Sequence, residues 1–190
     1  MSSFSLGGKY LRKGMRRLLL ALLLLLPMEP PPAMAVSSEY KLKAALIYKL
    51  TRFVEWPREN RTGGSFGICI LGRDDFGSAL DALESRKVDG LPIRIRRLVQ
   101  SDAVDSSCQI LFVSESKRPF LHSILASLKG RPILTIGDLD GFAEKGGMIE
   151  FVRGRQRIGF RINLQQADRA GLKIAAPLLE LSTIVETERT

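Results

Sequence analysis

Histidine is almost absent from this chain, which contains one, His122, among 190 residues. Histidine is the usual base of hydrolytic triads and a common ligand of catalytic zinc. His122 lies off the apolar stripe of its predicted helix and has no acid or cysteine beside it, so we interpret it as a surface side chain. The sequence also lacks a Gly-x-Ser-x-Gly elbow and a His-Glu-x-x-His motif. We therefore predict no catalytic residue, no metal ligand, no cofactor-binding residue and no enzymatic activity.

Motifs for phosphate and for calcium are incomplete. Gly72–Ser78 follows a predicted strand and opens a helix, but it lacks the lysine of a phosphate-binding loop, and its two aspartates would repel an anion. Asp138–Gly141 lacks the third acid and the closing glutamate of a calcium loop. We interpret both segments as turns.

Long apolar runs are lacking too. Leu18–Leu26 follows a basic stretch, is broken by Pro27, and is followed by the small-x-small sequence Ala33-Met34-Ala35. The run is about half the ~20 residues that a membrane-spanning helix needs. We therefore expect residues 1–35 to be a secretory signal peptide and residues 36–190 to be one exported domain.

The expected mature chain is only moderately basic. Without the leader, 24 basic side chains face 19 acidic ones, so the net charge falls from +9 to +5. The tightest basic cluster, Arg94, Arg96 and Arg97, lies on a predicted strand and is not interleaved with aromatic residues. We interpret it as a solvent-exposed strand face and predict no nucleic-acid partner.

Cysteine is scarce, with two residues, Cys69 and Cys108. A structural zinc site needs four ligands, which this chain does not offer in a recognisable pattern. In an exported protein an even cysteine count favours a disulfide. The alternative is two buried thiols that never meet. A bridge closing a loop of about 40 residues would stabilise the fold by about 4 kcal/mol in the chain-entropy model.

Hydrophobic periodicity predicts alternating helices and strands up to about residue 137, and a hairpin beyond it. The predicted helices span residues 39–54, 75–83, 118–129 and 164–170, and the predicted strands span 66–71, 93–98, 109–113, 133–136, 148–152 and 156–163. Alternation implies parallel strands joined by right-handed crossovers. We therefore expect an α/β fold: a single three-layer domain with a mainly parallel sheet flanked by helices and a C-terminal antiparallel hairpin.

The tail beginning at Leu172 is apolar although it lies near the end of the chain, where cores are usually complete. Exposed apolar surface of this kind can bind a partner. The alternative is that the tail docks on its own sheet. The candidate partner surface consists of Leu172, Ile174, Pro177, Leu178 and Leu179.

A series of short motifs, taken in order, resembles the YfiR-like family of bacterial periplasmic proteins over about residues 37–185. The motifs are Lys43–Leu50, Phe53–Pro57, Ile68–Gly72, Asp75–Gly77, Gln109–Ser114, Leu134–Asp138, Gly146–Ile149 and Phe160–Asn163. The resemblance implies a periplasmic repressor that binds the periplasmic region of an inner-membrane diguanylate cyclase. Such a repressor lowers cyclic-di-GMP synthesis and thereby restrains biofilm formation.

The resemblance carries further implications about partners and bridges. It implies homodimers, and a second partner, an OmpA-like outer-membrane lipoprotein that draws the repressor away. Cys69 and Cys108 match one of two family disulfides. The second pair has no counterpart here, because the stretch from Gly141 to Gly154 contains no cysteine. Redox control through that second bridge is therefore not expected.

A different class of function remains open from the residues alone. A parallel sheet offers a crevice at the carboxyl ends of its strands. That rim would include Gly72, Arg73, Ser114 and Gly137 and would suit a periplasmic small-molecule binding or transport-accessory protein. An enzyme with an unrecognised site would instead need a deep polar cleft with converging acids.

Overall fold

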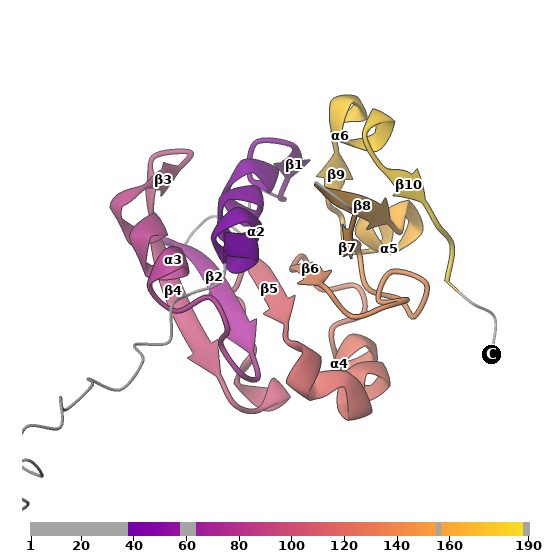
Figure 1. Cartoon of the computed structure of the whole chain (residues 1–190), viewed down its shortest axis with the longest axis horizontal. Helices are drawn as coiled ribbons and strands as arrows, with labels where there is room; N and C mark the ends of the chain where they lie inside the picture. Colours follow the sequence, from indigo (N-terminus) through magenta and orange to yellow (C-terminus); the bar gives the residue numbers. More distant parts are fainter. Residues whose placement is uncertain (1–37, 58–63, 155–156, 188–190) are drawn as a thin grey trace, which may run out of the picture. The chain divides into compact units, whose positions relative to one another are not determined.

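A computed structural model of the chain describes residues 38–57, 64–154 and 157–187. The expected leader, residues 1–35, lies outside this description. The described residues form an α/β domain in which helices cover both faces of a central sheet (Figure 1). The predicted three-layer fold is thus confirmed.

The central sheet has eight strands in the order β10-β8-β7-β6-β5-β2-β4-β3. Their bounds are β2 Phe66–Leu71, β3 Lys87–Val88, β4 Leu91–Leu98, β5 Ile110–Val113, β6 Leu134–Gly137, β7 Ile149–Arg153, β8 Ile158–Ile162 and β10 Thr183–Ile184. The predicted hairpin is β7–β8, which is antiparallel.

The sheet is mixed, however, and not mainly parallel as expected. A tight turn at Asp89-Gly90, both with positive φ, adds the short antiparallel strand β3 at one edge. At the other edge the tail returns and pairs β10 parallel to β8. Neither addition follows from strand–helix alternation, since β3 and β10 each contain two residues.

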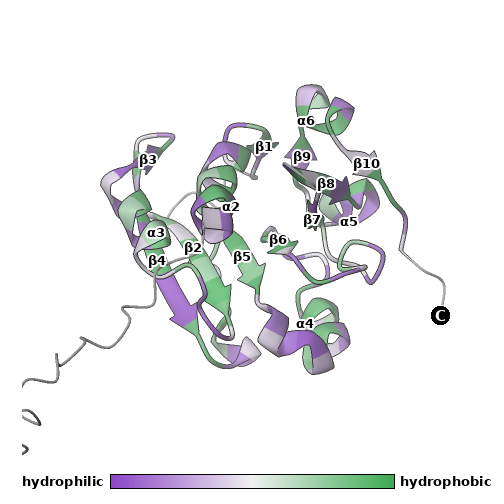
Figure 2. Ribbon diagram, in the orientation of Figure 1, coloured by the Kyte–Doolittle hydropathy of each residue, from purple (hydrophilic) through white to green (hydrophobic). Residues whose placement is uncertain are grey.

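The central strands are buried on both faces. All six residues of β2 are buried, and alternate side chains enter different cores: Ile68 and Ile70 on one face, Cys69 and Leu71 on the other. Figure 2 shows the corresponding apolar colouring of β2 and β5. A continuous apolar run is the signature of a strand covered on both sides, and here it predicted the strand bounds of β2 correctly.

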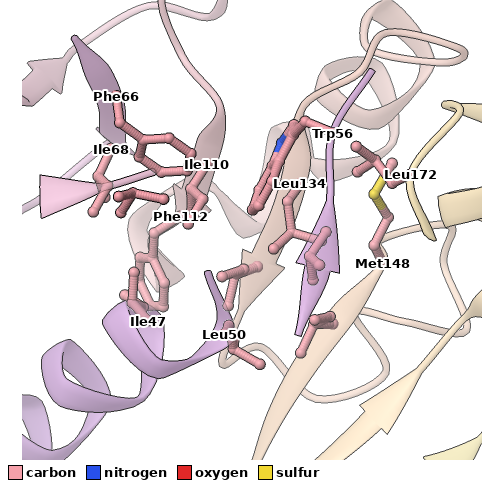
Figure 3. Packing of buried hydrophobic residues seen from close by; sticks show 14 of the residues in the cluster. Ile47, Leu50, Trp56, Phe66, Ile68, Ile110, Phe112, Leu134, Met148 and Leu172 are labelled. Carbon is pink, nitrogen blue, oxygen red and sulfur yellow. The ribbon is translucent and has the colours of Figure 1, made fainter. Parts of the chain in front are cut away.

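The larger core lies under helix α2, Ser38–Leu50, which inserts Ala44, Ile47 and Leu50 against the sheet (Figure 3). The helix was expected to continue to residue 54, but it ends at Leu50. Val54–Glu55 forms strand β1 instead, paired antiparallel with β9, Lys173–Ile174, in a separate two-stranded sheet. The end of this segment is anchored by Trp56, whose indole Nε1 donates to the Gln109 carbonyl at 3.1 Å.

The second core lies under helix α4, Leu121–Ser127. The predicted helix 118–129 is divided, because Glu115–Phe120 forms a 3-10 segment, η4, that contains Pro119. Ser114 caps this segment by accepting a hydrogen bond from the Ser116 amide. α4 then packs its buried Leu121, Ile124 and Leu125 against the sheet.

The remaining helices are short. The predicted helix 75–83 becomes α3, Ser78–Asp81, continued by the 3-10 segment η2, Ala82–Ser85. A further 3-10 turn, η3, spans Ser101–Ala103, and α5 and α6 span Leu164–Arg169 and Ala176–Glu180. Across the described ranges, no helix has the length and apolarity to cross a membrane.

Candidate functional site

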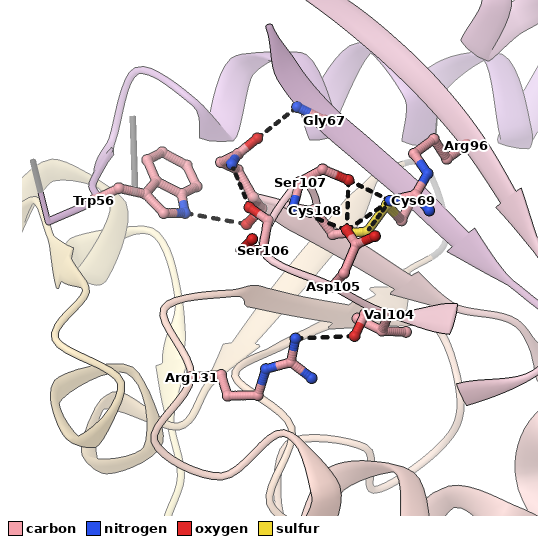
Figure 4. The surroundings of a disulfide bond; sticks show 11 residues. Trp56, Gly67, Cys69, Arg96, Val104, Asp105, Ser106, Ser107, Cys108 and Arg131 are labelled. Atoms are coloured by element: carbon pink, nitrogen blue, oxygen red, sulfur yellow. Dashed lines mark hydrogen bonds and ion pairs between the residues drawn. A yellow bond between two sulfur atoms is a disulfide. The ribbon is translucent and has the colours of Figure 1, made fainter. Parts of the chain in front are cut away.

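The two cysteines form a disulfide between neighbouring strands. Cys69 lies in β2 and Cys108 two residues before β5, and their Cα atoms are 5.7 Å apart (Figure 4). Both side chains are fully buried in the second core. The bridge therefore links β2 to the start of β5 inside the second core, where a reacting partner cannot reach it. We interpret it as a structural disulfide.

A polar cluster covers the bridge on its solvent side (Figure 4). The guanidinium of Arg96 lies 2.7 Å from Asp105 Oδ1 and 3.8 Å from Cys108 Sγ, and it also contacts Ser107. Hydrogen bonds from the Ser107 hydroxyl, from Arg96 and from the Ser107 amide lower the pKa of Asp105 to about 2. Two of the three arginines of the basic cluster seen in the sequence are thus paired within the domain, because Arg97 also binds Asp74 and Asp81.

A charged cavity of about 340 Å³ opens near the carboxyl ends of β5 and β6. We call it the edge cavity. Its lining side chains come from α2, from the loops after β5 and β6, and from the β7–β8 hairpin: Glu39, Tyr40, Lys43, Glu115, Asp138, Asp140, Phe151, Arg153 and Ile158. Four acids and two bases on this wall give the cavity a negative balance.

Lys43 and Asp138 form the buried centre of the edge cavity. The Lys43 ammonium lies 2.5 Å from Asp138 Oδ2 and 2.7 Å from Glu39 Oε1. The Tyr40 hydroxyl donates to the same Asp138 oxygen at 3.3 Å, and burial, followed by the charge of Asp138, raises the pKa of Tyr40. Asp138 Oδ1 is buried and has no hydrogen-bond partner among the described residues.

This arrangement gives a role to two residues that the sequence did not connect. Lys43 lies beside the apolar side chains of α2, yet its side chain is only 6% exposed and pairs inside the domain. The Asp138–Gly141 segment is a turn, as expected, but its first residue is the counter-ion of Lys43. A lysine within an apolar stripe is the one sequence signal that could have indicated a buried acid elsewhere.

The crevice expected at the carboxyl ends of the strands is filled after β2. The Arg73 amide donates to Ser116 Oγ at 2.9 Å. A Cβ added to Gly72 would lie 2.5 Å from that same oxygen, so side chains already occupy the space above the glycine. None of the four expected rim residues, Gly72, Arg73, Ser114 and Gly137, lines the edge cavity, which lies beside them.

The candidate partner surface is only partly available. Leu172 is fully buried and Leu178 is 4% exposed, because both pack into the larger core, so these two residues are withdrawn from the surface. Ile174 and Leu179 are half-buried and Pro177 is exposed. The tail thus combines the two alternatives that the sequence left open. Part of it packs into the larger core, and another part keeps apolar side chains exposed to solvent.

Two exposed apolar side chains of the same segment were missed by the sequence analysis. Leu181, after α6, is 75% exposed, and Ile184, in β10, is 50% exposed. We use the name C-terminal surface for Pro177, Leu181 and Ile184 with the half-buried Ile174 and Leu179. β10 also has a neighbour on one side alone among the described strands, which leaves an edge available for pairing.

His122 is exposed on α4, as expected for a surface histidine. In residues 38–57, 64–154 and 157–187, no three side chains of histidine, cysteine, aspartate or glutamate gather as a metal site would need. Two acids of the edge cavity, Glu39 and Asp138, are instead paired with lysine, arginine and tyrosine side chains.

A family model described as YfiR/HmsC-like matches residues 40–183. This chain belongs to the YfiR/HmsC-like family. The family is periplasmic, regulatory and non-catalytic. In this YfiR/HmsC-like chain the matched region runs from Tyr40 in α2 to Thr183 in β10, so it contains the disulfide and nearly the whole of the edge cavity and of the C-terminal surface.

Proposed function

We propose that this protein is a periplasmic negative regulator that binds the periplasmic region of an inner-membrane diguanylate cyclase and lowers cyclic-di-GMP synthesis. The family match over residues 40–183 carries this proposal. The signal peptide expected in residues 1–35 would deliver the domain, residues 36–190, to the compartment in which that region of the cyclase lies.

The C-terminal surface is the proposed contact with the cyclase. Leu181 and Ile184 are large, apolar and exposed; Leu181 precedes the two-residue edge strand β10, and Ile184 belongs to it. Exposed apolar side chains beside an unpaired strand edge suit protein binding through both burial and strand addition. The same segment could serve a homodimer or an OmpA-like outer-membrane lipoprotein, and competition among these partners for one surface would relieve the repression.

A genetic experiment tests the regulatory proposal. Deletion of the gene should raise cellular cyclic-di-GMP and thicken the biofilm. The complete sequence should restore both phenotypes, whereas a chain that begins at residue 36 and stays in the cytoplasm should restore neither. Unchanged cyclic-di-GMP after deletion, in a strain with an intact cyclase gene, would refute the proposal.

The edge cavity favours a second candidate, a periplasmic small-molecule binding or transport-accessory protein. Its volume of about 340 Å³ falls within the range of about 300–1,000 Å³ that is typical of pockets for drug-sized ligands. Asp138, with its unpaired buried oxygen, offers an acceptor that a ligand donor could use after a small rearrangement. A thermal-shift screen with amino acids and cell-wall fragments tests this candidate, and the absence of any stabilising compound at millimolar concentration would count against it.

A further inference from the structure

A second cavity, separate from the edge cavity, lies between α4 and α5. We call it the basic cavity. It has a volume of about 220 Å³ and is lined by His122, Leu125, Ala126, Lys129, Lys145, Gly146, Gln166, Arg169 and Thr187. No acidic side chain is among these described lining residues, whereas three lysine or arginine side chains are.

The charges of the basic cavity are poorly compensated. Within the described part of the chain, neither Lys129 nor Arg169 has an ion-pair or side-chain hydrogen-bond partner. Lys145 donates to a carbonyl, that of Asp140, at 3.1 Å. The nearest acid in sequence to Lys145, Glu144, faces Arg161 at 3.9 Å instead. The cavity therefore combines several positive charges with no described counter-ion, which favours an anionic occupant.

The polar wall of the basic cavity is held in place from inside the domain. Asn163 is fully buried, and its amide nitrogen donates to the Ala143 carbonyl and to Thr187 Oγ1, each at 2.9 Å. Gln166 Nε2 donates to the same Thr187 oxygen at 2.9 Å. This network fixes Gln166 and Thr187 before any ligand arrives, which lowers the entropic cost of binding.

The floor of the cavity is apolar. Leu125 is 9% exposed and Ala126 is the next residue of α4. Above Gly146, the position of an added Cβ has no atom within 4 Å, so the loop leaves open space there. We propose that the basic cavity binds a small organic anion, with its carboxylate toward Lys129 and Arg169 and its apolar body on Leu125 and Ala126.

Hexanoate is a suitable probe, because it combines one carboxylate with an apolar chain that a cavity of about 220 Å³ can hold. Titration of the isotope-labelled, oxidised protein should produce saturable amide shifts at Gly146 and Gln166. Acetate, which lacks the apolar body, and hexanol, which lacks the charge, should both bind more weakly. Inorganic phosphate that bound as tightly as hexanoate would overturn the role of the apolar floor.

Two matched double variants test the assignment. Lys129→Ala with Arg169→Ala should weaken hexanoate binding by at least about ten-fold, the effect expected for lost hydrogen bonds to a charged group. Lys87→Ala with Arg94→Ala removes two exposed charges at the β3–β4 edge and should leave the affinity unchanged. Equal weakening in both variants would show a nonspecific effect of net charge, and no weakening in the first would place the anion elsewhere. Because neither test involves the cyclase, the outcome is independent of the proposed regulatory function.

Discussion

Lys43 and Asp138 form an ion pair inside the domain, with 2.5 Å between the ammonium nitrogen and the carboxylate oxygen Oδ2. Their side chains are 6% and 10% exposed. The pair connects α2, near the start of the described domain, to the loop after β6, about a hundred residues later. It therefore holds α2 against the loop at the carboxyl end of β6.

Removing one partner of this pair should be strongly destabilising. Lys43→Ala should lower the free energy of unfolding by about 3–5 kcal/mol, because Asp138 would remain charged and buried without its counter-ion. Lys43→Met combined with Asp138→Leu should cost less than the single change. Urea denaturation provides the measurement, and Lys49→Ala, an exposed lysine of the same helix, is the control. A single variant as stable as the control would contradict the importance of the pair.

The disulfide should contribute a similar amount. Cys69→Ser removes a bridge between residues 39 apart in sequence, for which the chain-entropy model gives about 4 kcal/mol. For a domain of this size, each kcal/mol lowers the melting temperature by about 2–4 °C. Calorimetry should show a drop of about 8–16 °C. Because the bridge is buried, the original protein should be reduced in denaturant and refolded with reductant, which should produce a comparable drop, whereas the same treatment should not change the variant. An original protein whose stability is unchanged by this treatment would indicate that the bridge does not form in solution.

Asp105 should make stability depend on acid pH. Its pKa is about 2 in the folded domain, below the value of about 3.9 for an unfolded chain. A lowered pKa means that the contribution is present above about pH 4 and is lost as the pH falls toward 2. The carboxylate is more than half exposed, so the effect should stay below about 1 kcal/mol. Asp105→Asn should flatten this part of the stability profile, and NMR titration of the carboxyl carbon should give the pKa directly.

The C-terminal surface should be separable from folding. Leu181→Asp and Ile184→Asp change exposed side chains, so they should alter the free energy of unfolding by less than about 0.5 kcal/mol. Binding to the periplasmic region of the cyclase should nevertheless be lost, because a charge would enter the apolar contact. Val99→Asp, at a 77% exposed position after β4, is the matched control and should bind normally. Equal binding by all three variants would place the interface elsewhere.

The strands were the easiest elements to predict from the sequence. A run such as Phe66–Leu71 is apolar throughout because both of its faces are covered. Burial on both faces requires an apolar residue at each consecutive position, so the sequence shows the strand directly. Helix ends were less predictable. Phe53 and Val54 continue the apolar arc of α2, yet Val54 pairs with Ile174 more than a hundred residues away. Local periodicity carries no information about such a distant strand partner.

The candidate sites were harder to predict, because they depend on which face each short element turns outward. Leu178 and Leu181 are equally apolar and three residues apart, but one is 4% exposed and the other 75% exposed. Likewise, Lys129 and Arg169 are ordinary surface residues in the sequence and come together only where α4 and α5 end beside one cavity. The disulfide was predictable because a chain with two cysteines allows a single intramolecular pairing.

One buried amide links distant parts of the chain. Asn163 caps α5 by accepting from the Gln166 amide, and it holds the loop at Ala143 and the chain at Thr187. These three segments therefore share one hydrogen-bonding centre, and local unfolding that releases it would release all of them. In a hydrogen-exchange experiment the amides of the loop before β7 and of the last described strand should then open as one cooperative unit. The segment at Thr187 would in this way report on the state of a loop more than forty residues upstream.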